Sequence, residues 1–111
     1  MKFVTIDSID QEIEVPEWDV ALEALIRDEF AKQGRLCLED LRRLAAEYSI
    51  RFDDLFTTLF ELVIHGRWHY VDAENKHRTL TRAELGRLFI GARIHYKDVR
   101  HYNGHWFPGA A

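Results

Sequence analysis

The fold of this chain is decided between Gly34 and Thr81, in the stretch GRLCLEDLRRLAAEYSIRFDDLFTTLFELVIHGRWHYVDAENKHRTLT. Its first part has apolar residues three and four apart, the spacing of amphipathic helices, and its second part alternates aromatic with polar residues, as strands do. Turn-forming residues separate the runs. The pattern predicts a helix over 38–48, a turn over 49–51, a helix over 52–65, a strand over 67–71, a turn over 72–76 and a returning strand over 77–80.

The flanking segments predict further elements. An apolar stripe that starts at Trp18 predicts a preceding helix, which Gly34 ends. Thr81 and Glu84 form a capping box, the usual start of a helix, and this fourth helix is expected to run to about Gly91. Two terminal hairpins are also expected, one from the β-rich runs 2–6 and 11–15 and one around Asn103-Gly104.

Residues 17–81 resemble a winged helix-turn-helix domain in the order of their elements and the spacing of their stripes. The resemblance implies that helix 52–65 takes the recognition position, with its first turns facing the partner. Arg35–Cys37 is expected to be either a connector or a brief strand, and the resemblance implies that such a strand would pair with the wing. We therefore predict one α+β domain over 1–111. Its winged helix-turn-helix-like core has three helices and a β-hairpin wing, preceded by an N-terminal β-hairpin. The basic, aromatic C-terminal extension over 82–111 adds a fourth helix and a C-terminal hairpin.

The first functional hypothesis is a small regulatory protein that associates with double-stranded DNA, working as a homodimer. Recognition-helix residues would face the bases, while arginines from helix 38–48 and cations from the wing and the extension would contact phosphates. The candidate contacts with DNA or another partner are Arg42, Arg43, Arg51, Asp53, Asp54, Thr57, Thr58, Lys76, His77, Arg78, Arg93, Lys97 and Arg100.

The charge of the recognition helix favours a second hypothesis. One arginine, Arg51, stands at its start against Asp53, Asp54 and Glu61. Because Lys and Arg supply most of the non-specific affinity for duplex DNA, this helix is poorly charged for a major groove. Function also has to be argued from the site rather than from the fold. The alternative is a protein-interaction module or small inhibitor that binds another protein through its acidic helix face or its aromatic tail.

Charge is divided unevenly along the chain. Residues 1–74 hold 8 Lys and Arg against 17 Asp and Glu, and residues 75–111 hold 7 against 2. Such an asymmetry indicates a nucleic-acid or membrane contact on the basic end, or a basic end that packs against the acidic one within a chain or between two copies. The second arrangement would favour a protein partner. The acidic residues that could form a docking face are Glu12, Glu14, Glu17, Asp19, Asp28, Glu29, Asp53 and Asp54.

Aromatic side chains are concentrated in the C-terminal tail. Three roles remain open for these rings: covering the chain's own core, anchoring a protein interface, or stacking on nucleic acid. The tail mixes these rings with cations, and the residues of both kinds are Arg93, Tyr96, Lys97, Arg100, Tyr102, Trp106 and Phe107.

We expect neither an enzyme nor a metalloprotein. The glycines form no phosphate-binding loop, and no nucleophile stands beside an evident base. Two histidine pairs have a spacing that can bind metal on a helix face, His65 with His69 and His101 with His105. The first pair straddles Gly66, where the helix ends, so its two imidazoles are expected to diverge. The second pair straddles the Asn103-Gly104 turn, where cross-strand neighbours can meet, with His95 as a third candidate ligand. Structural or surface histidines are the preferred interpretation. No cofactor is expected.

Composition indicates a globular protein with its own core. The chain has 111 residues, of which 47% are hydrophobic and 31% charged. No apolar run is long enough for a membrane span, and no secretory signal is recognisable. The lone cysteine, Cys37, is expected to be a small buried residue in a reducing compartment, so we expect a cytoplasmic protein.

Overall fold

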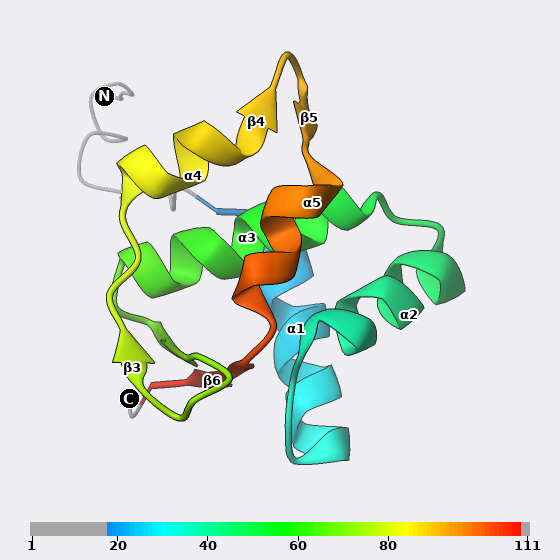
Figure 1. The fold of residues 1–111 in the computed structure, drawn as a ribbon. Coiled ribbons are helices and arrows are strands. Elements are labelled where there is room, and N and C mark those ends of the chain that lie inside the picture. The colour runs from blue at the N-terminus through cyan, green and yellow to red at the C-terminus, as the bar shows by residue number, and fades with distance from the viewer. Residues whose placement is uncertain (1–17, 110–111) are drawn as a thin grey trace, which may run out of the picture.

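The computed structural model describes residues 18–109, which form an α+β fold of helices and small antiparallel sheets (Figure 1). The hairpin predicted from runs 2–6 and 11–15 lies outside the described residues. No helix within the described part of the chain is long and apolar enough to span a bilayer. The elements are α1 (Val20–Gln33), α2 (Leu38–Tyr48), α3 (Phe52–Ile64), β2 (Trp68–Val71), β3 (His77–Arg78), α4 (Arg82–Leu88), β4 (Phe89–Ile90), β5 (Arg93–Ile94), α5 (Tyr96–Val99), the 3-10 helix η2 (Arg100–Tyr102) and β6 (His105–Pro108).

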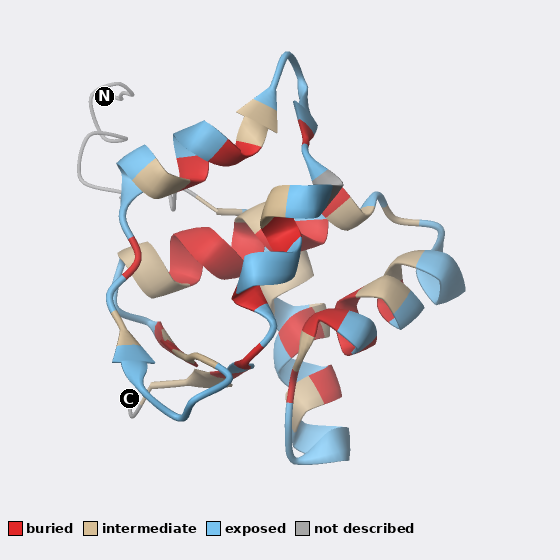
Figure 2. Ribbon diagram, in the orientation of Figure 1, coloured by how far each residue is buried: buried red, intermediate tan, exposed pale blue. Residues whose placement is uncertain are grey.

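Helix α3 lies at the centre of the molecule. It contacts α1, α2, α4 and β2, and in Figure 1 α4 is seen on the opposite side of α3 from β3 and β6. Leu55, Phe56, Leu59 and Phe60 are fully buried, as the red ribbon of α3 in Figure 2 shows. Leu62 is also fully buried, so the helix is covered around most of its circumference. A helix that is apolar on several faces has to be enclosed in this way.

The helices begin and end close to their predicted limits. α1 starts at Val20, just after Trp18, the first residue of the predicted stripe, because the carboxylate of Asp19 accepts hydrogen bonds from the N–H groups of Ala21 and Leu22 and caps the helix there. It ends at Gly34, whose φ of 72° is left-handed. α2 ends at Ser49, which also adopts a left-handed conformation and turns the chain into α3.

The aromatic tail closes the core. The ring of Phe56 contacts the rings of Tyr102 and Trp106 at centroid distances of 5.9 and 5.8 Å. Phe60 contacts the same two rings. Trp106 is fully buried and Tyr102 nearly so. Of the three roles left open by the sequence, these two side chains therefore serve the chain's own core.

The predicted C-terminal hairpin is wrong. Residues before Asn103 are helical, in α5 and η2, and β6 pairs antiparallel with β2 in a sheet of order β3-β2-β6. The Asn103-Gly104 step leads from η2 into this strand, and the Gly104 N–H donates to the Tyr70 hydroxyl at 3.0 Å. Burial of Trp106 against the core outweighs the local turn preference, because a hairpin would leave that ring in water.

The segment before α2 is a connector, one of its two predicted forms. Arg35–Cys37 forms no strand beside the wing. Instead the Leu36 carbonyl accepts a hydrogen bond from the Trp106 N–H in β6, at 3.0 Å. β6 therefore lies between β2 and this segment.

The fourth helix starts as predicted, at the capping box of Thr81 and Glu84. It ends at Leu88 rather than near Gly91, and a short β4–β5 hairpin follows. Gly91 has a φ of 65°, a conformation that L side chains rarely adopt and that turns the chain here. This hairpin was not predicted, since its strands have only two residues each.

Candidate functional site

A cleft of about 370 Å³ lies between the start of α1, α3 and the β4–β5 hairpin. We call it the acidic groove, because four of its side chains are carboxylates and one is an arginine. It contains five of the predicted contact residues. Its lining is Trp18, Asp19, Leu22, Arg51, Asp53, Asp54, Thr57, Thr58, Glu61, Phe89 and Ala92.

Asp53 is the anchor between α3 and the C-terminal extension. Its carboxylate accepts hydrogen bonds from Arg93 Nε at 2.8 Å, from the Ile94 N–H at 3.2 Å and from Arg51 at 3.3 Å. Burial raises the pKa of this carboxyl, but the hydrogen bonds from Arg93, Ile94 and Arg51 outweigh it and hold the pKa below its ordinary value. Asp53 is therefore charged, nearly buried and already compensated by the chain itself.

The other carboxylates of the groove divide into paired and exposed groups. Glu61 accepts two hydrogen bonds from the Arg82 guanidinium, at 2.9 and 3.0 Å, and is buried. Asp19 caps α1 and is exposed. Asp54 is exposed and makes no ion pair within residues 18–109. The negative charge that the groove presents to solvent therefore comes mainly from Asp19 and Asp54.

The face of α3 predicted to meet a partner is largely covered. Asp54 is the only residue of this helix in the exposed class; Thr57 is half-buried and Thr58 buried. The cover comes from the C-terminal extension, which contributes Arg82 and Arg93 to the ion pairs described above. Of the five predicted contact residues at the start of this helix, Arg51 and Asp54 are therefore the exposed ones.

A second cleft, of about 410 Å³, lies between the start of α2 and the segment from η2 to β6. We call it the basic cleft. It brings together two predicted contact residues that are far apart in the sequence, Arg42 and Arg100. Its lining is Cys37, Leu38, Glu39, Arg42, Arg100, Asn103 and His105.

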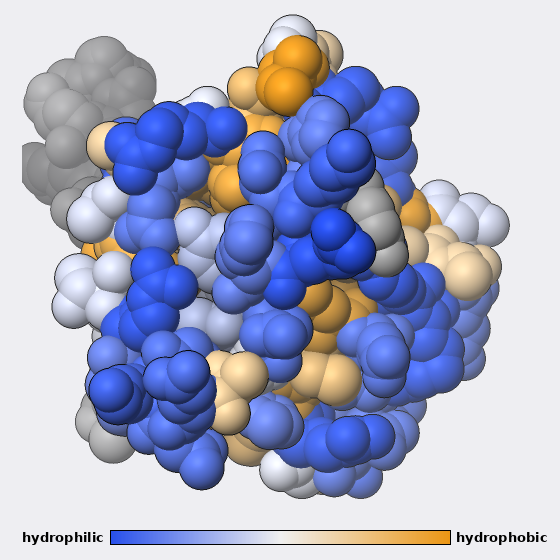
Figure 3. Space-filling model, viewed as in Figure 1, coloured by the Kyte–Doolittle hydropathy of each residue, from blue (hydrophilic) through white to orange (hydrophobic). Residues whose placement is uncertain are grey.

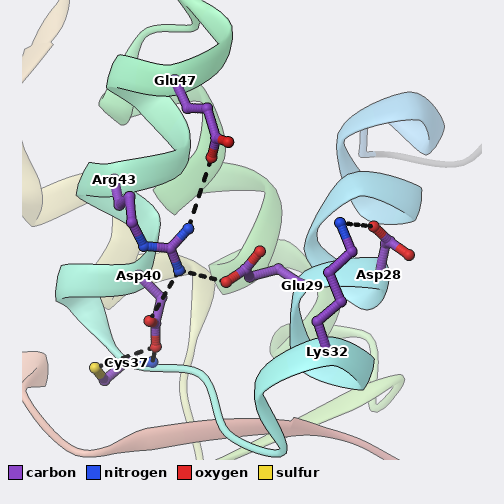
Figure 4. A network of polar contacts seen from close by, with 7 residues as sticks. All are labelled: Asp28, Glu29, Lys32, Cys37, Asp40, Arg43 and Glu47. Carbon is purple, nitrogen blue, oxygen red and sulfur yellow. Dashed lines mark hydrogen bonds and ion pairs between the residues drawn. The ribbon is translucent and has the colours of Figure 1, made fainter.

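Arg43, the neighbour of Arg42, points elsewhere. Figure 4 shows its guanidinium between α2 and α1, where it contacts Glu29, Asp40 at 3.2 Å and Glu47 at 3.7 Å. Glu29 is buried, so the pair joins the two helices. The predicted phosphate contact at Arg43 is therefore occupied by carboxylates of the same chain.

The remaining predicted contacts lie apart from both clefts. Arg78 pairs with Glu84 at 3.0 Å and lies over the Tyr102 ring. Lys76 and His77 are exposed on the wing, and Lys97 is exposed on α5. The predicted residues thus form two clefts, a wing group and isolated side chains rather than one continuous surface.

The two histidines of the first pair have different neighbours. The His65 ring contacts Trp18 at 5.2 Å, whereas the His69 ring contacts His77 and Phe107 on the sheet. Among residues 18–109, no group of three or more His, Cys, Asp and Glu side chains is placed to hold a metal ion.

Sequence reasoning missed three features of these sites. The acidic groove includes Phe89 and Ala92 of the unpredicted hairpin, and one of its carboxylates, Glu61, is paired with Arg82 of α4. The basic cleft includes His105, which the predicted hairpin would have placed differently. Gly91, a residue typical of turns, could have indicated the β4–β5 hairpin from the sequence. Pairings between distant segments leave no comparable local pattern.

Comparisons with protein-family models, with curated proteins and with solved structures gave no match to this chain.

Proposed function

We propose that this chain is a small, non-catalytic protein-interaction module on a winged-helix frame, whose acidic groove binds a basic segment of its partner. The observation that carries the proposal is the enclosure of α3. Its only exposed residue is the acidic Asp54, and Arg82 and Arg93 of the extension are paired with Glu61 and Asp53. Basic residues that a DNA reader would present are thereby used within the fold.

The groove suits a lysine or arginine side chain of a partner. Apolar residues line part of it, Trp18, Leu22, Phe89 and Ala92, and the exposed carboxylates Asp19 and Asp54 lie beside them. Such side chains have an apolar stem and a charged head, so a mixed lining of this kind can contact both parts. Complementary charge would also speed the encounter of the two proteins.

The β4–β5 hairpin supplies an apolar contact next to the groove. Ile90 at its tip is 62% exposed, and Figure 3 shows hydrophobic atoms on this projection. Apolar side chains next to a charged rim are the usual composition of a protein interface. The bound segment would therefore be basic with at least one apolar residue.

The second candidate is the DNA-associated regulator. Two observations favour it: Arg42 and Arg100 lie in one cleft, and Lys76 and His77 are exposed on the wing. In that case binding would weaken steeply with salt, because phosphate contacts release counterions.

Fluorescence anisotropy can separate the two candidates. The probes are a labelled lysine- and arginine-rich peptide with leucines, a peptide of the same length with glutamates in place of the cations, and a labelled duplex DNA. The chain is tested as parent, as Asp54→Lys in the groove and as Glu74→Lys. Glu74 is exposed in the wing turn and does not line the groove, so the second variant controls for net charge.

Of the three probes, we expect only the basic peptide to bind. Asp54→Lys should weaken its affinity at least about tenfold, which corresponds to about 1.4 kcal/mol. Glu74→Lys should leave its affinity unchanged. Duplex binding that disappears in an Arg42→Gln/Arg100→Gln double variant would replace the proposal with the DNA-associated regulator. An equal loss of affinity for the basic peptide in both lysine variants would show non-specific charge attraction, and would refute the acidic groove as the binding site. Light scattering on the same samples would test the expected homodimer.

We also propose a cytoplasmic location, which the single cysteine supports.

A further inference from the structure

The basic cleft carries an inference that is independent of the protein-binding proposal. Its cationic and polar side chains come from two segments that meet only in the folded chain: Arg42 from α2, and Arg100, Asn103 and His105 from the C-terminal part. Glu39 is the only carboxylate in its lining. In Figure 3 hydrophobic atoms are visible in a hollow between α5 and the start of α2, with hydrophilic residues around it.

One of the two arginines is held in place. The Arg42 guanidinium lies over the Phe52 ring, 4.8 Å from its centroid, at the start of α3. A guanidinium stacked in this way loses less conformational freedom when it binds an anion, and its planar fork matches the oxygens of a phosphate.

The start of α2 adds backbone donors. The Cys37 N–H and thiol both donate to Asp40 Oδ2, at 2.9 and 3.3 Å, and the N–H groups of Asp40 and Leu41 donate to the Cys37 carbonyl. Within residues 18–109 no acceptor is found for the N–H groups of Leu38 and Glu39. Together with the helix dipole, such groups favour an anion at this position.

We propose that the basic cleft binds the phosphoryl group of a small phosphate monoester. A dianionic tetrahedral group can accept hydrogen bonds from several directions at once, which suits donors on two arginines, an asparagine, a histidine and a helix start. The cleft volume of about 410 Å³ lies in the range of small-ligand sites and is concave, whereas a duplex needs an open surface. Leu38 provides an apolar contact for the remainder of the ester.

Cys37 makes the site directly measurable. It is the only cysteine of the chain and it lines the cleft. A bound ligand should therefore slow the reaction of its thiol with the neutral reagent iodoacetamide. Inorganic phosphate, phosphoserine and duplex DNA are titrated separately at constant ionic strength, and the backbone amide resonances of Leu38 and Glu39 are followed by NMR as a second readout.

We expect saturable protection of the thiol by phosphoserine, with shifts of both amides. Arg100→Gln, a change at an exposed residue, should weaken binding about tenfold or more, because it removes charge-assisted hydrogen bonds to the phosphoryl group. Glu39→Gln should strengthen binding several-fold, because it removes the only carboxylate of the cleft. Arg87→Gln, an exposed arginine outside the cleft, should leave binding unchanged.

The arms of the titration also decide the source of the phosphoryl group. Tighter binding of phosphoserine than of inorganic phosphate supports a monoester ligand. Protection by duplex DNA alone would overturn the proposal in favour of a nucleic-acid contact. Absence of protection and of amide shifts with either phosphate compound would overturn it outright, and an unchanged affinity in Arg100→Gln would place any binding elsewhere.

Discussion

Asp53, at the start of α3, accepts a hydrogen bond at 2.8 Å from Nε of Arg93, 40 residues later in the chain. The pair joins the central helix to the β4–β5 hairpin, and the neighbouring Ile94 N–H donates to the same carboxylate oxygen. The acidic start of α3 is therefore first of all a structural anchor for the C-terminal extension. Its neighbour Asp54 is exposed, so a comparison of the two aspartates tests the anchoring role of Asp53.

Asp53→Asn should destabilise the fold by about 1–3 kcal/mol. The three donors share one carboxylate oxygen; a neutral amide oxygen in its place forms weaker hydrogen bonds with them and leaves the Arg93 charge uncompensated. Asp54→Asn is the matched control, and we expect a change of at most about 0.5 kcal/mol at this exposed site. Urea denaturation measures both. Equal losses in the two variants would contradict the anchoring role of Asp53.

Acid should weaken the fold through Asp53 and Asp40. Burial alone raises the pKa of each, but hydrogen bonds dominate, from Arg93 at Asp53 and from Cys37 at Asp40, so both pKa values lie below the ordinary 3.8. A lowered pKa in the folded state stabilises the protein above the unfolded-state pKa, and this contribution is lost as pH falls through the folded-state pKa.

The free energy of unfolding should therefore decrease as pH is lowered from about 5 into the range below 3.8. The decrease should be shallower in Asp53→Asn than in the parent. Urea denaturation at a series of pH values measures it. A slope that is the same in the variant would show that Asp53 titrates alike in the folded and unfolded states.

Gly104→Ala should be strongly destabilising. A Cβ at this position would lie 2.0 Å from the Val71 carbonyl oxygen and 2.7 Å from Asp72 Cα, both of them backbone atoms that cannot move aside easily. We expect a loss of at least about 2 kcal/mol. Gly86→Ala in α4 meets open space, and there alanine should stabilise the helix by about 0.5–1 kcal/mol. Thermal unfolding of the two variants should thus shift in opposite directions, and a stable Gly104→Ala protein would refute the close packing of β6 on β2.

Trp106→Ala should cost about 3–5 kcal/mol, because it removes a fully buried ring that contacts Phe56, Phe60 and Tyr70. Phe107→Ala changes the next residue of the same strand, where the ring is only half-buried, and should cost about 1 kcal/mol. Chemical denaturation followed by circular dichroism compares them. Similar small losses would show that the tail is peripheral rather than part of the core.

Alkaline pH should weaken the fold through Tyr102. Burial, and then the hydrogen bond to Glu84, raise the pKa of this hydroxyl well above 10.0. A raised pKa stabilises the folded state below the unfolded-state pKa, and the contribution is lost as pH rises above it. Tyr102→Phe should therefore lose less stability between neutral pH and about pH 11 than the parent does. Identical profiles would contradict a buried, neutral Tyr102.

The elements that the sequence determined are those with local causes. α2 and α3 follow from the spacing of their apolar residues, and the start of α4 follows from the reciprocal hydrogen bonds of Thr81 and Glu84. Helical periodicity and capping depend on residues a few positions apart. They can therefore be recognised in one sequence without knowledge of the rest of the fold.

Tertiary structure alone decided where the C-terminal extension lies, and with it the two clefts. Pairing of β6 with β2, Arg93 with Asp53, and Arg100 beside Arg42 all join segments that are distant in the chain. The Asn103-Gly104 step has a strong local turn preference, yet burial of Trp106 overrides it. Such pairings depend on which buried surfaces and charges come together when the whole chain folds. These long-range pairings therefore cannot be predicted from a local sequence pattern.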